Sequence, residues 1–273
     1  MMLSSCRKVV DTYVPPLGRS YRLLRDATNR RRSMPTSYGF TLAGDPSMAR
    51  DGYESEEIES FLQLLASHDA VIDIGANVGL YSCLAASSGK QAIAVEPVPR
   101  NLNYLYRNLW ENEFRDVEVF PLGLAAKCGL GRIYGYGGIA SFVPGWAQAR
   151  EAQFSLVPLT TLDTIAAGRF TGGKLLIKMD VEGFELDVLA GAAETLERSP
   201  KPAWLVEILL RGEVVPGGIS RRFTETFKLF WAHGYRSKKL DSALTPVGPD
   251  QVSHWVENGF VDGDAHNFLF SVE

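Results

Sequence analysis

The stretch VIDIGANVGLYS, residues 71–82, surrounds a single carboxylate with apolar residues and follows it with two glycines. Its apolar start predicts a buried strand, and Gly75 and Gly79 predict a turn from that strand into a helix. Such a turn presents backbone N–H groups and the positive end of a helix, which normally favour an anion. The carboxylate of Asp73 therefore raises the question of which ligand the turn accepts.

Short apolar runs with the length of buried strands recur along the chain. They are AVIDIG, AIAVEP, VEVFPL, LLIKMD, AWLVEI and NFLFSV. Apolar stripes with helical spacing lie between them. These stripes are Ile58, Phe61, Leu62 and Leu65; Leu102, Leu105, Tyr106 and Leu109; Phe184, Val188, Ala192 and Leu196; and Phe223, Phe227, Phe230 and Trp231. Strands that alternate with helices predict an α/β fold, with a mainly parallel sheet and helices on both faces.

The composition predicts one large domain behind a basic leader. The chain has 273 residues, of which 45% are hydrophobic, and this suffices for the core of one α/β domain. We expect a helical or partly disordered leader over residues 1–37 and the domain over residues 38–273. Residues 1–33 hold eight Lys or Arg against two Asp, although the whole chain has a net charge of -4. The acidic remainder makes nucleic acid an unexpected partner, whereas the leader is solvated, docked, or in peripheral contact with a membrane or glycan.

Neither a membrane span nor a disulfide framework is expected. No run approaches the roughly 18 apolar residues of a spanning helix, and the basic start lacks the features of a signal peptide. The three cysteines are scattered and have no C-x-x-C spacing. The default expectation is a soluble cytoplasmic protein.

Residues 125–160 interrupt the regular alternation with a segment rich in glycine and aromatic residues. This insertion suits a loop that covers a substrate, and it suits an added hairpin that extends the sheet equally well. Its end, FSLVPLTTLDTI, predicts a strand that enters a short helix. The aromatic side chains either stack on a sugar or pack within the protein.

The glycine spacing favours S-adenosylmethionine over a dinucleotide. Gly75-x-x-x-Gly79 differs from the G-x-G-x-x-G of dinucleotide sites, and the Asp73 carboxylate would repel a diphosphate. S-adenosylmethionine offers a carboxylate to the turn and cationic groups to Asp73. Glu96, at the end of the second strand, suits two ribose hydroxyls, and Pro97 fixes the turn after it. Taken alone, Asp73 would be interpreted as a turn or helix-capping residue.

The block LLIKMDVEGFELDVLAGA, residues 175–192, is more specific. Lys178 and Asp180 point to one side near the end of their strand, and a lysine in an apolar strand is paired or functional. With VIDIGANVGLYS, AVEPVPRNLNYLYRNLWEN, VPLTTLD, LVEI and NFLF, this block resembles the FkbM-type family of S-adenosylmethionine-dependent methyltransferases. The resemblance covers roughly residues 38–271 and omits the basic leader.

This resemblance implies a Rossmann-like class I methyltransferase fold, with a mainly parallel seven-stranded sheet and one late antiparallel strand beside the fifth. It also implies methyl transfer, usually to a hydroxyl oxygen of a sugar, glycan or secondary metabolite, with S-adenosylhomocysteine as product. The residues that would bind the cofactor are Asp73, Gly75, Ala76, Asn77, Gly79, Glu96, Pro97, Gly123, Leu124 and Asp180.

An alcohol acceptor must lose a proton near the transition state, which calls for a general base or a metal. Asp180 and Glu207 close the fourth and fifth strands, and Lys178 would keep them ionised or stabilise an alkoxide. The same three side chains would also fit a structural ion pair. His266, at the start of an antiparallel last strand, is a further candidate base. A divalent metal on Asp180 and Glu207 is not expected, because no third ligand is recognisable.

Two other functions fit parts of the sequence. A protein with this fold could bind the cofactor or act as a scaffold without turnover. An NAD-dependent oxidoreductase would share the glycine turn, but the missing G-x-G-x-x-G counts against it. The acceptor, a small molecule or a glycan, and the oligomeric state are not specified by the sequence.

Overall fold

The computed structural model describes residues 32–211 and 220–272. The chain divides into two compact units, Met1–Tyr53 and Glu54–Glu273. In the described part of the first unit, β1 (Ser33–Pro35) pairs antiparallel with β2 (Thr41–Ala43), and the short helix η1 (Pro46–Ala49) follows. Most of the predicted leader lies outside the described residues, so its character stays a prediction.

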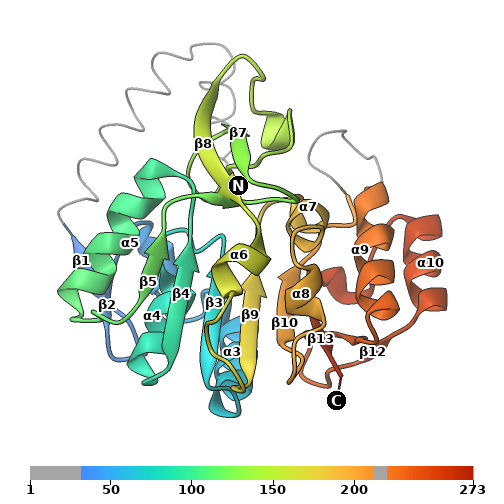
Figure 1. Ribbon diagram of the computed structural model, residues 1–273, viewed down its shortest axis with the longest axis horizontal. Coiled ribbons are helices and arrows are strands. Elements are labelled where there is room, and N and C mark those ends of the chain that lie inside the picture. The colour runs from blue at the N-terminus through green and yellow to red at the C-terminus, as the bar shows by residue number, and fades with distance from the viewer. Residues whose placement is uncertain (1–31, 212–219, 273) are drawn as a thin grey trace. The chain divides into compact units, whose positions relative to one another are not determined.

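The second unit is built on an eight-stranded sheet with the order β12-β11-β13-β10-β9-β3-β4-β5 (Figure 1). Its strands are β3 (Ala70–Ile74), β4 (Gln91–Val95), β5 (Glu118–Phe120), β9 (Leu175–Met179), β10 (Ala203–Glu207), β11 (Arg236–Lys239), β12 (Pro246–Val247) and β13 (Asn267–Ser271). Neighbours among β3, β4, β5, β9 and β10 run parallel, and β13 is antiparallel to both β10 and β11. The predicted apolar runs are all strands, which confirms the α/β class and the late antiparallel strand.

Two details differ from the predictions. The main sheet has an eighth strand, because the two residues of β12 pair with the edge of β11. The apolar stripe from Phe184 to Leu196 is divided between two short helices, α7 (Glu185–Leu189) and α8 (Ala193–Leu196). The chain turns at Gly191 between them, where an added Cβ would lie 2.2 Å from the carbonyl oxygen of Ala125.

Helices cover both faces of the sheet. Besides α7 and α8, they are α3 (Ser55–Ala66), α4 (Leu80–Ser87), α5 (Pro99–Glu111), α6 (Leu162–Ala166), α9 (Arg221–Ala232) and α10 (Pro249–Asn258). Alternate strand residues such as Ile72, Ile177 and Trp204 form one core with apolar side chains of α6 to α10. Within residues 32–211 and 220–272, no helix is long and apolar enough to cross a membrane.

The opposite face of the strands carries the polar side chains. Asp73 and Lys178 are direct neighbours in the register of β3 and β9. Asp73 contacts Ser82 of α4, and Lys178 contacts Glu57 of α3. The two-residue period of a strand thus separates an apolar face from one that holds buried charge at the carboxyl ends of the strands.

The insertion forms a sheet of its own above the main one (Figure 1). This sheet has the order β6-β8-β7, with β6 (Gly123–Leu124), β7 (Gly129–Tyr134) and β8 (Phe154–Thr160). The 3₁₀ turns η2 (Gly137–Ile139) and η3 (Trp146–Gln148) connect β7 to β8, and β8 leads into α6 as predicted. The hairpin therefore does not extend the main sheet.

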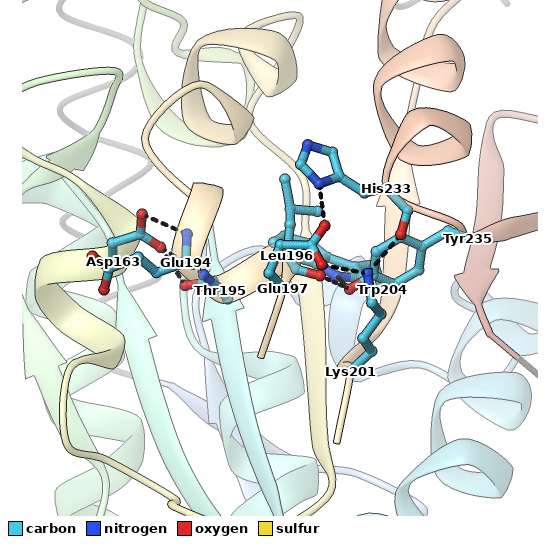
Figure 2. A network of polar contacts seen from close by, with 9 residues as sticks. All are labelled: Asp163, Glu194, Thr195, Leu196, Glu197, Lys201, Trp204, His233 and Tyr235. Carbon is cyan, nitrogen blue, oxygen red and sulfur yellow. Dashed lines mark hydrogen bonds and ion pairs between the residues drawn. The ribbon is translucent and has the colours of Figure 1, made fainter. Parts of the chain in front are cut away.

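A polar network ties α8, β10 and α9 together near the amino end of β10 (Figure 2). The Glu197 carboxylate pairs with His233 Nδ1 at 2.6 Å and with Lys201 Nζ at 3.0 Å. The Tyr235 hydroxyl donates to the carbonyl of Leu196 at 3.1 Å. Each charge here has a partner of opposite sign or a carbonyl, so the network serves the packing of these elements.

Candidate active site

A cleft opens at the carboxyl ends of β3, β4 and β9. Ligands of open α/β sheets bind at this edge. The predicted residues that line it are Gly75, Asn77, Glu96, Pro97, Gly123, Leu124 and Asp180. The structure thus brings together most of the residues that the sequence singled out.

Gly75 allows two strand ends to meet beneath the cleft. Its φ is +82°, and a Cβ added there would lie 1.8 Å from the carbonyl oxygen of Asp180. No larger residue fits without moving the backbone, so the turn after β3 and the turn after β9 depend on this glycine.

Ala76 and Gly79 shape the turn but are not among the residues that line the cleft. The Ala76 N–H donates to the carbonyl of Val95 at 3.0 Å, which fixes the turn to β4. Gly79 has a φ of +89°, and a Cβ there would lie 2.4 Å from Leu105 Cδ1. These two residues position the loop.

Asp73 lies below the cleft and does not line it. Its carboxylate accepts a hydrogen bond of 2.6 Å from the hydroxyl of Ser82, and only 1% of the residue is exposed. Burial raises the pKa of Asp73 to about 6, although the Ser82 bond and the nearby Lys178 lower it. Any effect of Asp73 on a ligand is therefore exerted through the turn above it.

Glu96 is clamped by the backbone on two sides. Its Oε2 accepts from the N–H of Asn77 at 2.8 Å, and its Oε1 accepts from the N–H of Val98 at 2.7 Å. Burial raises the pKa of this carboxyl to about 7, against the lowering effect of those two bonds. Each carboxylate oxygen can accept a second hydrogen bond, so Glu96 can still receive ligand hydroxyls from the cleft.

Asn101 in α5 is a polar lining residue that the sequence did not single out. It is 2% exposed, and its Nδ2 donates to the carbonyl of Gly137 at 3.2 Å. Its Oδ1 has no hydrogen-bond partner within the part of the chain that the structure describes. A buried acceptor without a partner is costly, so a ligand donor in the cleft would stabilise it. The only sequence signal was a polar residue next to Leu102 on an apolar helix face.

Lys178 lies at the centre of a buried charge cluster. Its Nζ is 3.3 Å from Glu57 Oε1, an ion pair without hydrogen-bond geometry, and 3.4 Å from Asp180 Oδ2. The ammonium also lies 4.7 Å from the centre of the Tyr81 ring. Burial lowers the pKa of Lys178, but the surrounding carboxylates, led by Asp180, raise it above its usual range. The lysine therefore stays charged.

Glu207 lies next to Asp180 at the end of β10. The Asp180 carboxylate raises the pKa of Glu207 most, and burial and a hydrogen bond between the two groups raise it further. Two adjacent carboxylates cannot both ionise at low cost, so this pair holds a proton at neutral pH. Glu207 faces Asn267 in the register of β10 and β13.

His266 precedes β13 at the carboxyl edge, where the sequence placed it, but its side chain is exposed and does not line the cleft. Its carbonyl accepts from the N–H of Ile208 at 2.7 Å. Its catalytic role stays a prediction. Among the residues that the structure describes, no group of three or more His, Cys, Asp or Glu side chains could hold a metal ion.

The insertion is fastened across the cleft to the turn that follows Asp180. Trp146 Nε1 donates to Glu182 Oε2 at 2.7 Å, and the Ser141 hydroxyl donates to the Glu182 carbonyl at 2.7 Å. A Cβ on Gly183 would lie 2.3 Å from the Trp146 ring, so the glycine makes room for the indole. The loop between β7 and β8 also contributes Phe142 to the lining. The insertion thus lines the cleft, and its role as a loop that covers a substrate stays a prediction.

The fold and the site together define a class of protein. Parallel strands with a reversed strand between β10 and β11, and a cleft at the ends of β3 and β4, are a Rossmann-like class I methyltransferase fold. The methyltransferase FkbM domain matches residues 73–237. The chain belongs to the FkbM methyltransferase family.

A curated relative is the hexuronic acid methyltransferase AglP of Haloferax volcanii, which is 27% identical over 150 residues. The match spans 53% of this chain and 58% of that protein, so it covers little more than half of either. Among solved structures, the O-methyltransferase of Bacillus cereus in complex with SAH has a TM-score of 0.43 at 12% identity, over 97% of this chain and 96% of that chain. Fibrillarin of Aeropyrum pernix, with natively bound S-adenosyl-L-methionine, has a TM-score of 0.41 at 12% identity, over 78% and 73%.

Proposed function

We propose that this protein is an S-adenosylmethionine-dependent methyltransferase that methylates a hydroxyl oxygen of a sugar, glycan or secondary metabolite. The observation that carries the proposal is the cleft between Glu96, clamped by two backbone N–H groups, and Asp180. Two features fit the cofactor. The Glu96 carboxylate lines the cleft, and the buried Asn101 Oδ1 has no hydrogen-bond donor among the residues that the structure describes.

Each lining residue has a role in this proposal. Glu96 and Asn101 would accept hydrogen bonds from ribose hydroxyls. Gly75 and Asn77 would present the turn to the methionine carboxylate, and Asp180 would face the cationic methionine end. Gly123 and Leu124 would lie along the adenine.

When bound, S-adenosylmethionine would supply a methyl group on a positively charged sulfur, and the acceptor oxygen would take this methyl group in line with the bond to sulfur, which leaves as a neutral thioether. The protein must align the acceptor, exclude water and receive the hydroxyl proton. The insertion, fastened by the hydrogen bond between Trp146 and Glu182, would exclude water. Asp180 lines the cleft and is our candidate base, Lys178 donates to it at 3.4 Å, and its carboxylate raises the pKa of the neighbouring Glu207.

The acceptor class rests on the relative that acts on a hexuronic acid, and we extend it here to a sugar or glycan acceptor. The basic leader would then serve to approach a glycan or an anionic membrane surface, in an otherwise cytoplasmic protein.

The test is isothermal titration of the full chain with S-adenosylhomocysteine and, separately, NADH. We expect saturable binding of S-adenosylhomocysteine, weakened at least about tenfold by Glu96→Gln, because the neutral amide loses charge-assisted hydrogen bonds. Glu151→Gln, which changes an exposed carboxylate of the insertion, is the matched control and should bind as the wild type does. Binding of NADH instead, or of neither ligand, would refute the proposal.

A further inference from the structure

Within residues 32–211 and 220–272, the cluster beneath the cleft holds more negative than positive groups. The Lys178 ammonium faces the carboxylates of Glu57 and Asp180 at 3.3 and 3.4 Å, and Glu207 and Asp73 also act on it. These four carboxyl groups surround the one ammonium of the cluster as the structure describes it. A buried surplus of charge is unfavourable unless something compensates it.

Asp180 is the member of the cluster whose carboxylate lies at the cleft. Its side chain is 34% exposed, whereas those of Lys178 and Glu57 are 4% and 10% exposed. Asp180 lines the cleft, and Lys178 and Glu57 do not. A cation bound in the cleft beside Asp180 would therefore compensate the surplus, and a neutral ligand in the same place would not.

Glu57 is held so that it competes with Asp180 for the lysine. Its Oε2 accepts a hydrogen bond of 2.8 Å from Asn267 Nδ2, which leaves Oε1 toward Lys178. The Tyr81 ring lies under the same ammonium. Lys178 is thus shared between two carboxylates instead of neutralising Asp180 alone.

The proposed cofactor and its product differ in charge at one atom. S-adenosylmethionine has a sulfonium, and S-adenosylhomocysteine has a neutral thioether in its place, while the rest of the two molecules is the same. A negative wall at this atom would favour the cofactor and ease release of the product.

We propose that Glu57 is a positioning residue that shares the Lys178 ammonium with Asp180, and so keeps the cleft negative enough to favour the sulfonium cofactor over the thioether product. The inference rests on the proposed function and deepens it. Glu57 precedes the matched family domain, which begins at residue 73.

The test compares the dissociation constants of S-adenosylmethionine and S-adenosylhomocysteine for the wild type and Glu57→Gln by isothermal titration. We expect the ratio Kd(S-adenosylmethionine)/Kd(S-adenosylhomocysteine) to rise on the order of fivefold in Glu57→Gln, because Lys178 then neutralises Asp180. Glu57→Asp keeps the charge and should stay within about twofold of the wild-type ratio. Glu59→Gln, an exposed change on the same helix, is the matched control and should not alter the ratio.

If Glu57→Gln only disturbed the packing, it would weaken the binding of both ligands equally and leave the ratio of the two dissociation constants unchanged. That result would overturn the inference. Should Glu57→Gln fail to fold, Asp180→Asn tests the same charge from a partly exposed side chain, and an unchanged ratio there would also overturn it. If the wild type binds neither ligand, the proposed function itself fails, and the inference falls with it.

Discussion

The two ends of β10 carry polar networks of opposite character. Near its amino end, Glu197 pairs with His233 and Lys201, and the Glu197 side chain is 56% exposed (Figure 2). Near its carboxyl end, Lys178 faces Glu57 and Asp180 in a buried cluster. In the first network, which is partly exposed, Glu197 lies between Lys201 and His233. In the second, which is buried, four carboxyl groups of the described residues surround one ammonium.

This difference separates a structural network from a functional one. Exposed ion pairs contribute little to stability, and they can be lost at small cost. A buried surplus persists only where the rest of the fold supports it, and such perturbed groups are concentrated at functional sites. Changing a lysine at each end of β10 tests this difference directly.

The largest difference is expected between the two lysines. Lys178→Met leaves buried carboxylates without their cation and should lower the free energy of unfolding by about 3–5 kcal/mol. Lys201→Met removes a partly exposed pair and should lower it by less than about 1 kcal/mol. Urea denaturation at pH 7 measures both. Similar losses in the two variants would remove the basis for the comparison.

Two glycines with the same backbone conformation give the next difference. Gly75 and Gly234 have φ values of +82° and +79°, but of the two only Gly75 would bring a Cβ within 4 Å of other atoms in the part of the chain that the structure describes. Gly234→Ala should cost about 1–2 kcal/mol for the left-handed conformation alone. Gly75→Ala should cost about 3 kcal/mol or more and abolish binding of S-adenosylhomocysteine. Thermal unfolding and titration give the two readouts, and equal costs would show that the two turns do not meet as described.

The buried carboxyl groups should also make the stability of the protein depend on pH. Burial raises the pKa of Asp73 from 3.8 to about 6, and those of Glu96 and Glu185 from 4.5 to about 7. The folded state therefore holds these protons more tightly than the unfolded state. The stability that the protons confer is fully present at a pH below the pKa of the unfolded chain, and it is lost as the pH rises through the pKa of the folded protein. From these three values we expect the free energy of unfolding to fall by roughly 5 kcal/mol between pH 5 and 7.

The control for this pH effect is Glu185→Gln, which should flatten part of the fall because the amide does not titrate. At the other end of β10, the partners His233 and Lys201 lower the pKa of Glu197. Its contribution is therefore lost only as the pH falls below about 4.5, outside this window. Urea denaturation at several pH values measures the slope, and a stability that rises from pH 5 to 7 would contradict the assignment.

The smallest effect is expected for Glu197→Gln. This exposed residue holds no group of the cleft, so binding of S-adenosylhomocysteine should stay unchanged and the melting temperature should stay within about 2 °C of the wild type. Differential scanning fluorimetry and titration provide the check. A large loss of stability would mean that the exposed network does more than its geometry indicates.

Local pattern was enough to predict the strands and much of the cleft. The runs that became β3, β4, β9 and β10 are continuous and apolar, and their ends carry Glu96, Asp180 and Glu207 at one edge. Lys178 was predicted to be paired or functional, because an apolar strand rarely holds an unpaired lysine. These features depend on neighbours within a few residues.

The missing features depend on contacts between distant segments. Glu57 meets Lys178 across 121 positions, and it could not be distinguished from the exposed acidic residues that begin α3. Asn101 is held at the cleft by its hydrogen bond to Gly137 of the insertion. Trp146 is held there by its hydrogen bond to Glu182. The burial of Asp73 behind Ser82 likewise follows from how α4 packs on β3. No periodicity encodes such pairings.

The most direct test of the central claim is a crystal structure of the protein with S-adenosylhomocysteine. We expect the ribose hydroxyls within hydrogen-bond distance of the Glu96 carboxylate, the thioether beside Asp180, and the insertion closed over the ligand. A ligand bound outside the cleft, or bound in the cleft with no contact to Glu96 and Asp180, would contradict the account.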